Sequence, residues 1–115
     1  MKKRKLLLTC LLIGLGFGPL LGSDSTVYKK ISIDTAIEVK QINPNIWQHI
    51  SYKETEKYGR VPANGLVLVD GKEALIIDTP WNDAQTTILI DWIQKKFKTN
   101  KLIVLPTHWH EDCMG

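Results

Sequence analysis

Three side chains that commonly bind metal ions lie two residues apart near the end of the chain. These are His108, His110 and Asp112, within the segment that runs from residue 107 to residue 115. Residues two apart in an extended segment project to the same side, so the two imidazoles can converge on one ion. Neutral imidazole suits zinc at about 2.0–2.1 Å, and the carboxylate can take a second ion or hold a metal-bound water. The spacing predicts a zinc site that activates water for hydrolysis.

The alternative is a chance pair of histidines in a surface loop. The position of the cluster favours a real site, because it directly follows the apolar run Leu102 to Leu105. Open α/β sheets bind ligands beyond the carboxyl ends of their strands. The remaining histidine, His49, lies far upstream inside a predicted strand, and we interpret it as an ordinary strand residue and not as a ligand.

A helix is predicted just before that run, over residues 82–98. Its apolar residues recur at helical spacing: Ile88, Leu89, Trp92, Ile93 and Phe97. Asn82 is a good N-cap, and Gln85 three residues later can complete a capping box. The run after it, residues 102–105, is uniformly apolar, which suits a strand buried on both faces. Strand, helix and strand together predict a βαβ unit with a right-handed crossover.

Strands are predicted upstream of the helix. Residues 32–42 and 46–52 are separated by a turn at residues 43–45, and residues 53–62 are polar and read as an exposed loop. The runs 66–69 and 74–77 are joined by Asp70-Gly71-Lys72, a strong hairpin signal. The fold class predicted for this part of the chain is therefore α/β.

The first 22 residues have the layout of a secretory signal peptide. A basic start at residues 2–5 precedes an apolar run of 16 residues, from Leu6 to Leu21, and small residues follow. A membrane-spanning helix is the alternative, but the run is shorter than the roughly 20 residues required. A lipoprotein signal ending at Cys10 is less favoured. We assign residues 1–22 to the signal peptide and residues 23–115 to the domain.

Removal of the signal changes the charge and the cysteine content. Fifteen basic and twelve acidic residues become eleven and twelve, because four basic residues lie at positions 2–5. No basic run then remains to suggest a nucleic-acid partner, and no membrane partner is expected. Cys113 is left as a single cysteine, so an intrachain disulfide is excluded.

The segment 75–81, the helix, the buried strand and the Thr-His-x-His-x-Asp pattern together resemble the N-terminal half of the metallo-β-lactamase superfamily. The resemblance runs from about residue 31 to residue 115. Cys113 stands where most other members have a zinc-binding histidine, which points to the class B β-lactamases, and His108 points to their main di-zinc subclass. The implied fold is the N-terminal half of an αββα sandwich, truncated at residue 115.

This resemblance implies a role for each matching residue. His108 and His110 would be ligands of a first zinc, and Asp112 would be the catalytic carboxylate that binds a second zinc and orients the hydroxide. Asp78 would support the zinc loop from below, or simply cap the end of its strand. Cys113 occupies a position that does not bind metal in this family.

The predicted loop over residues 53–62 resembles the mobile hairpin that closes over substrate. Tyr58 and Val61 would be its apolar contacts with a small β-lactam molecule. A solvated charged loop without that role is the alternative.

The implied function is zinc-dependent hydrolysis of the β-lactam ring, conferring antibiotic resistance, by a periplasmic and monomeric enzyme that holds two zinc ions. Alternatives are a related hydrolase of thioesters or lactones, and a secreted binding domain with an incidental metal site. We expect the 115-residue chain alone to be inactive and poorly folded. The rest of the pattern would supply three of six zinc ligands, and without it the apolar faces of the strands and of residues 88–97 would be uncovered.

Overall fold

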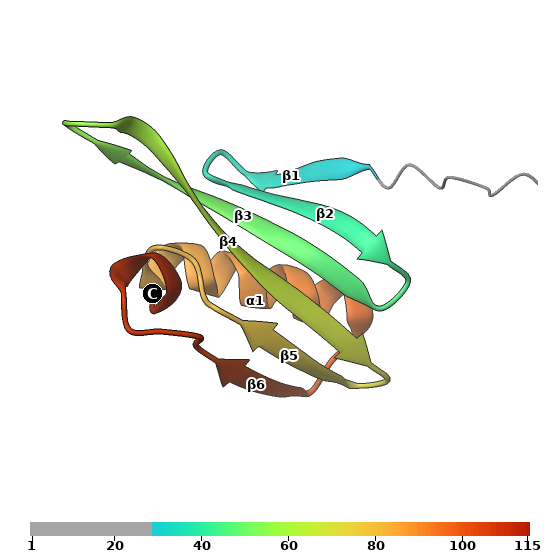
Figure 1. Cartoon of the computed structure of the whole chain (residues 1–115). Helices are drawn as coiled ribbons and strands as arrows, with labels where there is room; N and C mark the ends of the chain where they lie inside the picture. The colour runs from blue at the N-terminus through green and yellow to red at the C-terminus, as the bar shows by residue number, and fades with distance from the viewer. Residues whose placement is uncertain (1–28) are drawn as a thin grey trace, which may run out of the picture.

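A computed structural model describes residues 29–115, which form one mixed six-stranded sheet with a single helix packed on one face (Figure 1). The predicted signal peptide, residues 1–22, lies outside the described residues. The strands are β1 (Lys30–Asp34), β2 (Ile37–Asn43), β3 (Ile46–Thr55), β4 (Gly59–Asp70), β5 (Glu73–Ile77) and β6 (Lys101–Leu105). They follow one another across the sheet in chain order. The α/β fold class predicted from the sequence is confirmed.

The first predicted strand, over residues 32–42, is in fact two antiparallel strands. β1 and β2 are joined at Thr35 and Ala36, where the Asp34 carboxylate accepts a hydrogen bond from the Ala36 amide at 3.1 Å. The prediction of one strand was wrong because the apolar alternation continues through the turn. A carboxylate that bonds the backbone two residues ahead supplies the turn without any glycine or proline.

The predicted loop over residues 53–62 is also wrong, since most of it is strand. β3 and β4 stay in register to their ends, with Thr55 opposite Gly59, and only residues 56–58 form the turn. Gly59 has a φ of 64° there, a conformation that glycine adopts without strain. The arms of the hairpin are exposed, so polar side chains are tolerated in them. Polarity alone therefore did not distinguish a projecting hairpin from a loop.

The next two elements match the prediction more closely. β4 and β5 form the expected hairpin, with Asp70 opposite Glu73 and Gly71 at a φ of 54°. β5 and β6 pair in parallel, and the helix α1 (Asp83–Phe97) connects them, so the βαβ unit is confirmed.

The core lies between α1 and the sheet. Its fully buried members come from β2 to β5 and from the helix: Val39, Trp47, Val67, Ala74, Ile76, Leu89 and Ile93. Trp47, Trp92 and Phe97 pack edge to face around this cluster, with ring centroids 5.3–5.9 Å apart. The expectation that the apolar face of the helix would be uncovered is wrong, because Leu89 and Ile93 are wholly buried against the sheet.

The edge of the sheet at β6 is less covered, on both faces. β6 is the edge strand, and Ile103, Val104 and Leu105 are each about half exposed, at 46, 47 and 53%. The prediction of a strand buried on both faces was therefore wrong for the described residues. Within residues 29–115 no helix has the length and apolar character needed to cross a bilayer.

The helix begins where the sequence predicts. The Asn82 side chain accepts a hydrogen bond from the Gln85 amide at 2.9 Å, which is the N-cap interaction. The reciprocal half of the capping box was predicted wrongly, because Gln85 Oε1 has no hydrogen-bond partner among the described residues. The Gln85 side-chain nitrogen donates to the Tyr52 carbonyl on β3 at 2.8 Å. Gln85 therefore ties the start of the helix to the sheet and not to its own cap.

Removal of the cap is expected to weaken the fold by a measurable amount. Asn82→Ala leaves an amide of the first turn without its acceptor and should lower the free energy of unfolding by about 1 kcal/mol. Urea unfolding followed by circular dichroism measures this change. Asn100→Ala, which removes a side chain of the same type in an exposed segment, should stay within about 0.5 kcal/mol of the parent. Equal losses in the two variants would contradict the capping role.

Candidate metal centre

The three predicted metal ligands lie where two neighbouring strands end. β5 stops at Ile77 and β6 at Leu105, and these residues are partners in the parallel ladder. The chain beyond β5 is fixed to β6, because the Asp78 amide donates to the Leu105 carbonyl at 3.1 Å. The segment after β6 then turns across this edge and ends in the short 3-10 helix η1 (Glu111–Cys113). The carboxyl ends of the strands thus carry the candidate site, as the sequence predicted.

Asp78 holds the metal-binding loop in place from below. Its carboxylate accepts hydrogen bonds from the Thr107 amide at 2.6 Å and from the Thr107 hydroxyl at 2.9 and 3.0 Å. Its backbone has a φ of 58°, a left-handed conformation that aspartate adopts more readily than most residues. Of the two readings open at the sequence level, these contacts favour support of the loop. Thr107 is the partner that the sequence did not single out.

The side chains of His108, His110 and Asp112 come together as their spacing predicted. One ligand atom from each lies within 4.8 Å of the others. The Nε2 of His108 is 3.6 Å from the Asp112 carboxylate, and the two imidazole rings meet edge to face with centroids 4.9 Å apart. The His108 and Asp112 side chains keep 44 and 39% of their surface exposed, so an ion and a water molecule can reach them.

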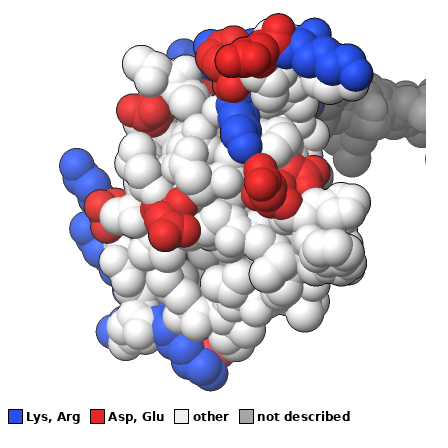
Figure 2. All heavy atoms as spheres, turned by 90° about the vertical axis from the view of Figure 1, so that its left-hand side faces the viewer, with Lys and Arg blue, Asp and Glu red and all other residues white. Residues whose placement is uncertain are grey.

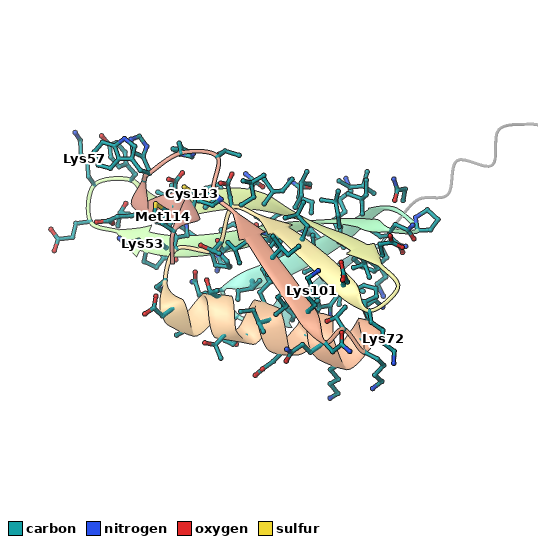
Figure 3. The ribbon with its side chains drawn as sticks, turned by 90° about the horizontal axis from the view of Figure 1, so that it is seen from below. Lys53, Lys57, Lys72, Lys101, Cys113 and Met114 are labelled. Atoms are coloured by element: carbon teal, nitrogen blue, oxygen red, sulfur yellow. The ribbon has the colours of Figure 1, made fainter. Side chains whose placement is uncertain are left out.

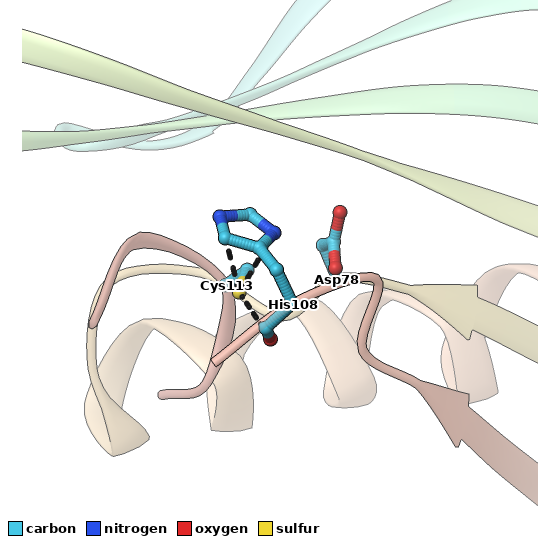
Figure 4. Close-up of side chains that lie close together, drawn as sticks. All are labelled: Asp78, His108 and Cys113. Atoms are coloured by element: carbon cyan, nitrogen blue, oxygen red, sulfur yellow. Dashed lines mark hydrogen bonds between the residues drawn. The ribbon is translucent and has the colours of Figure 1, made fainter. Parts of the chain in front are cut away.

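Cys113 lies against the imidazole of His108 (Figure 4). Its sulfur is 3.6 Å from Nδ1 of His108, and Asp78 completes a second group of possible ligand atoms within 4.8 Å. However, the thiol is 98% buried and sits 3.1 and 3.3 Å from the carbonyl oxygens of His108 and His110. The Asp78 carboxylate is already engaged by Thr107. These contacts suit a thiol that donates to the backbone, and they are compatible with the expectation that Cys113 does not bind metal.

The β3–β4 hairpin reaches the same end of the molecule. Figure 3 shows Lys53 toward the same end of the molecule as Cys113 and Met114, with Lys72 and Lys101 farther along the sheet. Lys53 forms an ion pair with Glu111 at 2.9 Å, and this partner lowers the pKa of Glu111 below its ordinary value. This exposed pair links the hairpin to the metal-binding loop.

The predicted substrate contacts lie on this hairpin. Tyr58 is 70% exposed in its turn, and Val61 is half-buried on the adjoining strand. Figure 2 shows acidic and basic side chains interspersed around a largely uncharged surface at this end. A small apolar or zwitterionic molecule could approach such a surface without meeting a field of one sign.

His49 lies beneath the site and is part of the core. Its ring is fully buried, and its Nε2 donates to the Asp78 carbonyl at 2.8 Å, so the ring supports the residue that holds the loop. Burial lowers the pKa of His49 from its ordinary value of 6.5, although the hydrogen bond to Asp78 opposes this. The sequence-based interpretation of His49 as a strand histidine agrees with its position.

The lowered pKa of His49 predicts an acid-sensitive fold. Below pH 6.5 the unfolded chain binds a proton at this position while the folded chain stays neutral, so acidification favours unfolding. We expect the free energy of unfolding, measured in urea with a chelator present, to fall between pH 7 and pH 5. The slope from one histidine is at most about 1.4 kcal/mol per pH unit.

Two variants separate this effect from other titrations. His49→Gln keeps an N–H donor for the Asp78 carbonyl but cannot bind the proton, and it should flatten the slope. His110→Gln removes an exposed imidazole and should leave the slope unchanged. The same slope in both variants and in the parent would show that His49 is not responsible.

At this point the fold and the site define an α/β protein with an open metal-binding loop at the carboxyl edge of its sheet. No protein-family model matches the chain. Among curated proteins it is 34% identical over 87 residues to the metallo-β-lactamase type 2 of Bacteroides fragilis, covering 76% of this chain and 35% of that protein. It is 36% identical over 111 residues to the metallo-β-lactamase type 2 of Bacillus cereus, covering 88% of this chain and 42% of that protein.

Solved structures give the same result. The crystal structure of VMB-1 is 41% identical with a TM-score of 0.65, over 70% of this chain and 36% of that one. A metallo-β-lactamase from Erythrobacter litoralis is 29% identical with a TM-score of 0.69, over 76% of this chain and 38% of that one. The chain belongs to the class B metallo-β-lactamases. It spans between 35 and 42% of the length of the two curated relatives named above.

The donor set fits the metal that this family name implies. Two imidazoles and a carboxylate are ligands that zinc accepts, and all three are at least partly open to solvent. A closed structural zinc site commonly has four protein ligands, whereas a catalytic site keeps a position for water. The described residues supply three candidate ligands, so they match part of an open site.

Proposed function

We propose that the protein containing this chain hydrolyses the amide of β-lactam antibiotics with bound zinc. The observation that carries the proposal is the convergence of His108, His110 and Asp112 at the carboxyl edge of a metallo-β-lactamase sheet. When bound there, zinc supplies a Lewis acid and a water nucleophile that is available at neutral pH. The relatives support the substrate class, because their names describe β-lactamases.

Each residue of the loop has a proposed task. His108 and His110 hold a first zinc through imidazole nitrogens, while Asp112 binds a second zinc and orients the attacking water with its carboxylate. The position of Asp112 supports this proposal, because its carboxylate lies 3.6 Å from His108 Nε2 and remains partly exposed. Tyr58 and Val61 contact the substrate from the hairpin. A complement of two zinc ions corresponds to the main di-zinc subclass.

The cellular setting is part of the proposal. Export through the signal peptide at residues 1–22 would deliver a monomeric enzyme to the periplasm, where β-lactams act, and would confer resistance. We also expect the 115-residue chain alone to be inactive. Its third histidine, His49, is fully buried and bonded to the Asp78 carbonyl, so it cannot join His108 and His110 as a ligand.

A chimera provides the sharpest test. Residues 29–115 of this chain would replace the matched region of the Bacteroides fragilis metallo-β-lactamase, and the purified chimera would be assayed with a chromogenic cephalosporin. We expect hydrolysis that a chelator abolishes and that added zinc restores. A folded chimera that binds zinc but does not hydrolyse the cephalosporin would refute the proposed function.

A parallel assay covers the other substrate classes. The same chimera would be given a thioester and a lactone, and we expect the cephalosporin to be the best substrate. A strong preference for either alternative would assign the chain to a different hydrolase of the same fold.

A further inference from the structure

Within residues 29–115, the Thr107 side chain forms hydrogen-bond contacts with both Asp78 and His108. Its hydroxyl lies 2.9 and 3.0 Å from the two Asp78 carboxylate oxygens and 2.9 Å from Nδ1 of His108. The Thr107 amide adds a third bond to the same carboxylate at 2.6 Å. The hydroxyl is therefore held in a fixed position between an acid and a metal-binding imidazole.

The direction of these hydrogen bonds follows from the number of protons available. A hydroxyl has one proton to donate, and an ionised carboxylate can only accept. The Thr107 hydroxyl must therefore donate to Asp78, which leaves its lone pairs facing His108. An unprotonated Nδ1 at 2.9 Å would place two lone pairs against each other, so Nδ1 must carry the proton and donate to the hydroxyl.

The consequence for His108 is a choice of tautomer. A neutral imidazole protonated on Nδ1 has its free lone pair on Nε2. Nε2 is the nitrogen that faces Asp112, at 3.6 Å, on the side of the predicted metal site. The Cys113 sulfur lies 3.6 Å from Nδ1 and 3.9 Å from Nε2, so the Thr107 hydroxyl, at 2.9 Å, is the nearer partner of Nδ1.

We infer that Thr107 is a positioning residue. Its hydroxyl links the Asp78 carboxylate to His108 and keeps the proton of His108 on Nδ1, so that Nε2 is free to bind metal. This Asp78–Thr107–His108 relay acts in the metal-free chain, so the His108 imidazole already has the metal-binding tautomer before an ion binds. Partners of this kind commonly change metal affinity about 10- to 100-fold when they are removed. The relay serves the same loop as the proposed function, but it can be tested without catalysis.

Nitrogen-15 NMR of the metal-free, histidine-labelled chimera, which carries residues 29–115 in a complete fold, tests the tautomer directly. At a pH where His108 is neutral, its shifts should report a proton on Nδ1. Thr107→Val removes the hydroxyl at nearly constant volume and should move the population toward the Nε2-protonated form. Thr107→Ser restores the hydroxyl and should return the parent pattern.

Thr79→Val is the matched control. The Thr79 hydroxyl also secures the loop, donating to the Cys113 carbonyl at 3.0 Å, but it forms no hydrogen bond with the imidazole. A loosened loop would therefore affect both valine variants, whereas loss of the relay would affect only Thr107→Val. We expect the tautomer of His108 to be unchanged in Thr79→Val.

A second measurement extends the test to the metal. Zinc affinity would be measured by competition with a chromogenic chelator, and Thr107→Val should weaken it about tenfold or more while Thr107→Ser stays close to the parent. A parent spectrum with the proton on Nε2, or equal shifts in Thr107→Val and Thr79→Val, would overturn the inference. Loss of hydrolysis in the chimera with the tautomer intact would count against the proposed function alone.

Discussion

His108→Ala in the chimera is expected to lower kcat/KM for the chromogenic cephalosporin by about a thousandfold or more. The variant removes an imidazole whose Nε2 faces Asp112 at the centre of the ligand cluster. Metal-ion catalysis contributes several kcal/mol of transition-state stabilisation, and about 4 kcal/mol corresponds to a thousandfold in rate. Steady-state kinetics at saturating zinc, together with zinc content by atomic absorption, would measure both the rate and the occupancy.

Two neighbouring carboxylates extend this prediction, one as a second ligand variant and the other as its matched control. Asp112→Asn should also cause a large loss, because Asp112 lies in the cluster, whereas Glu111→Gln removes only an exposed pair with Lys53. Exposed pairs of that kind contribute little to stability. We expect Glu111→Gln to retain the parent rate within a few-fold. Activity of His108→Ala near the parent value would contradict the assignment of the metal centre.

Gly65→Ala is expected to prevent the chain from folding. A Cβ at this position would lie closer than 3.0 Å to the buried imidazole of His49 and to the carbonyl oxygen of Ile77. Neither neighbour can move freely, because His49 is bonded to Asp78 and the Ile77 carbonyl belongs to β5. Overpacking of a rigid site costs about 3 kcal/mol or more, which is a large part of the stability of a small domain.

The yield of soluble protein and the near-ultraviolet circular dichroism of the tryptophans would reveal this failure. Gly71→Ala is the control, since a Cβ there meets nothing within 4 Å and only the φ of 54° is unfavourable. That strain should cost about 1–2 kcal/mol. A Gly65→Ala chain as stable as Gly71→Ala would show that the sheet accommodates the methyl group at this position.

The sequence was sufficient to predict an element when all the residues that stabilise it lie within one segment of the chain. The helix from Asp83 to Phe97 has its apolar stripe and its Asn82 cap within a single segment, and both are present in the structure. The β4–β5 hairpin likewise carries its own turn at Gly71. The two-residue spacing of His108, His110 and Asp112 predicted that their ligand atoms would come together, and they lie within 4.8 Å of one another.

Sequence-based predictions were wrong where the structure of a segment depended on residues that are distant in the sequence but close in space. The polar arms of residues 53–62 became strands because each pairs with the other, and pairing is invisible to composition. The apolar run in β6 predicted burial on both faces, yet β6 lies at the edge of the described sheet and remains half exposed. Gln85 has the spacing of a capping box, but its side-chain nitrogen donates to a carbonyl on β3 and its Oε1 has no hydrogen-bond partner among the described residues.

The sequence by itself determined the type of chemistry, because ligand identity and spacing are local properties of a short loop. Only the tertiary structure decided how that loop is held. The Asp78–Thr107–His108 contacts join the end of β5 to the residues after β6, a separation of 29 residues between Asp78 and Thr107. Hydrogen bonds are directional and short, so a relay of this kind exists only once the sheet has brought the two strand ends side by side.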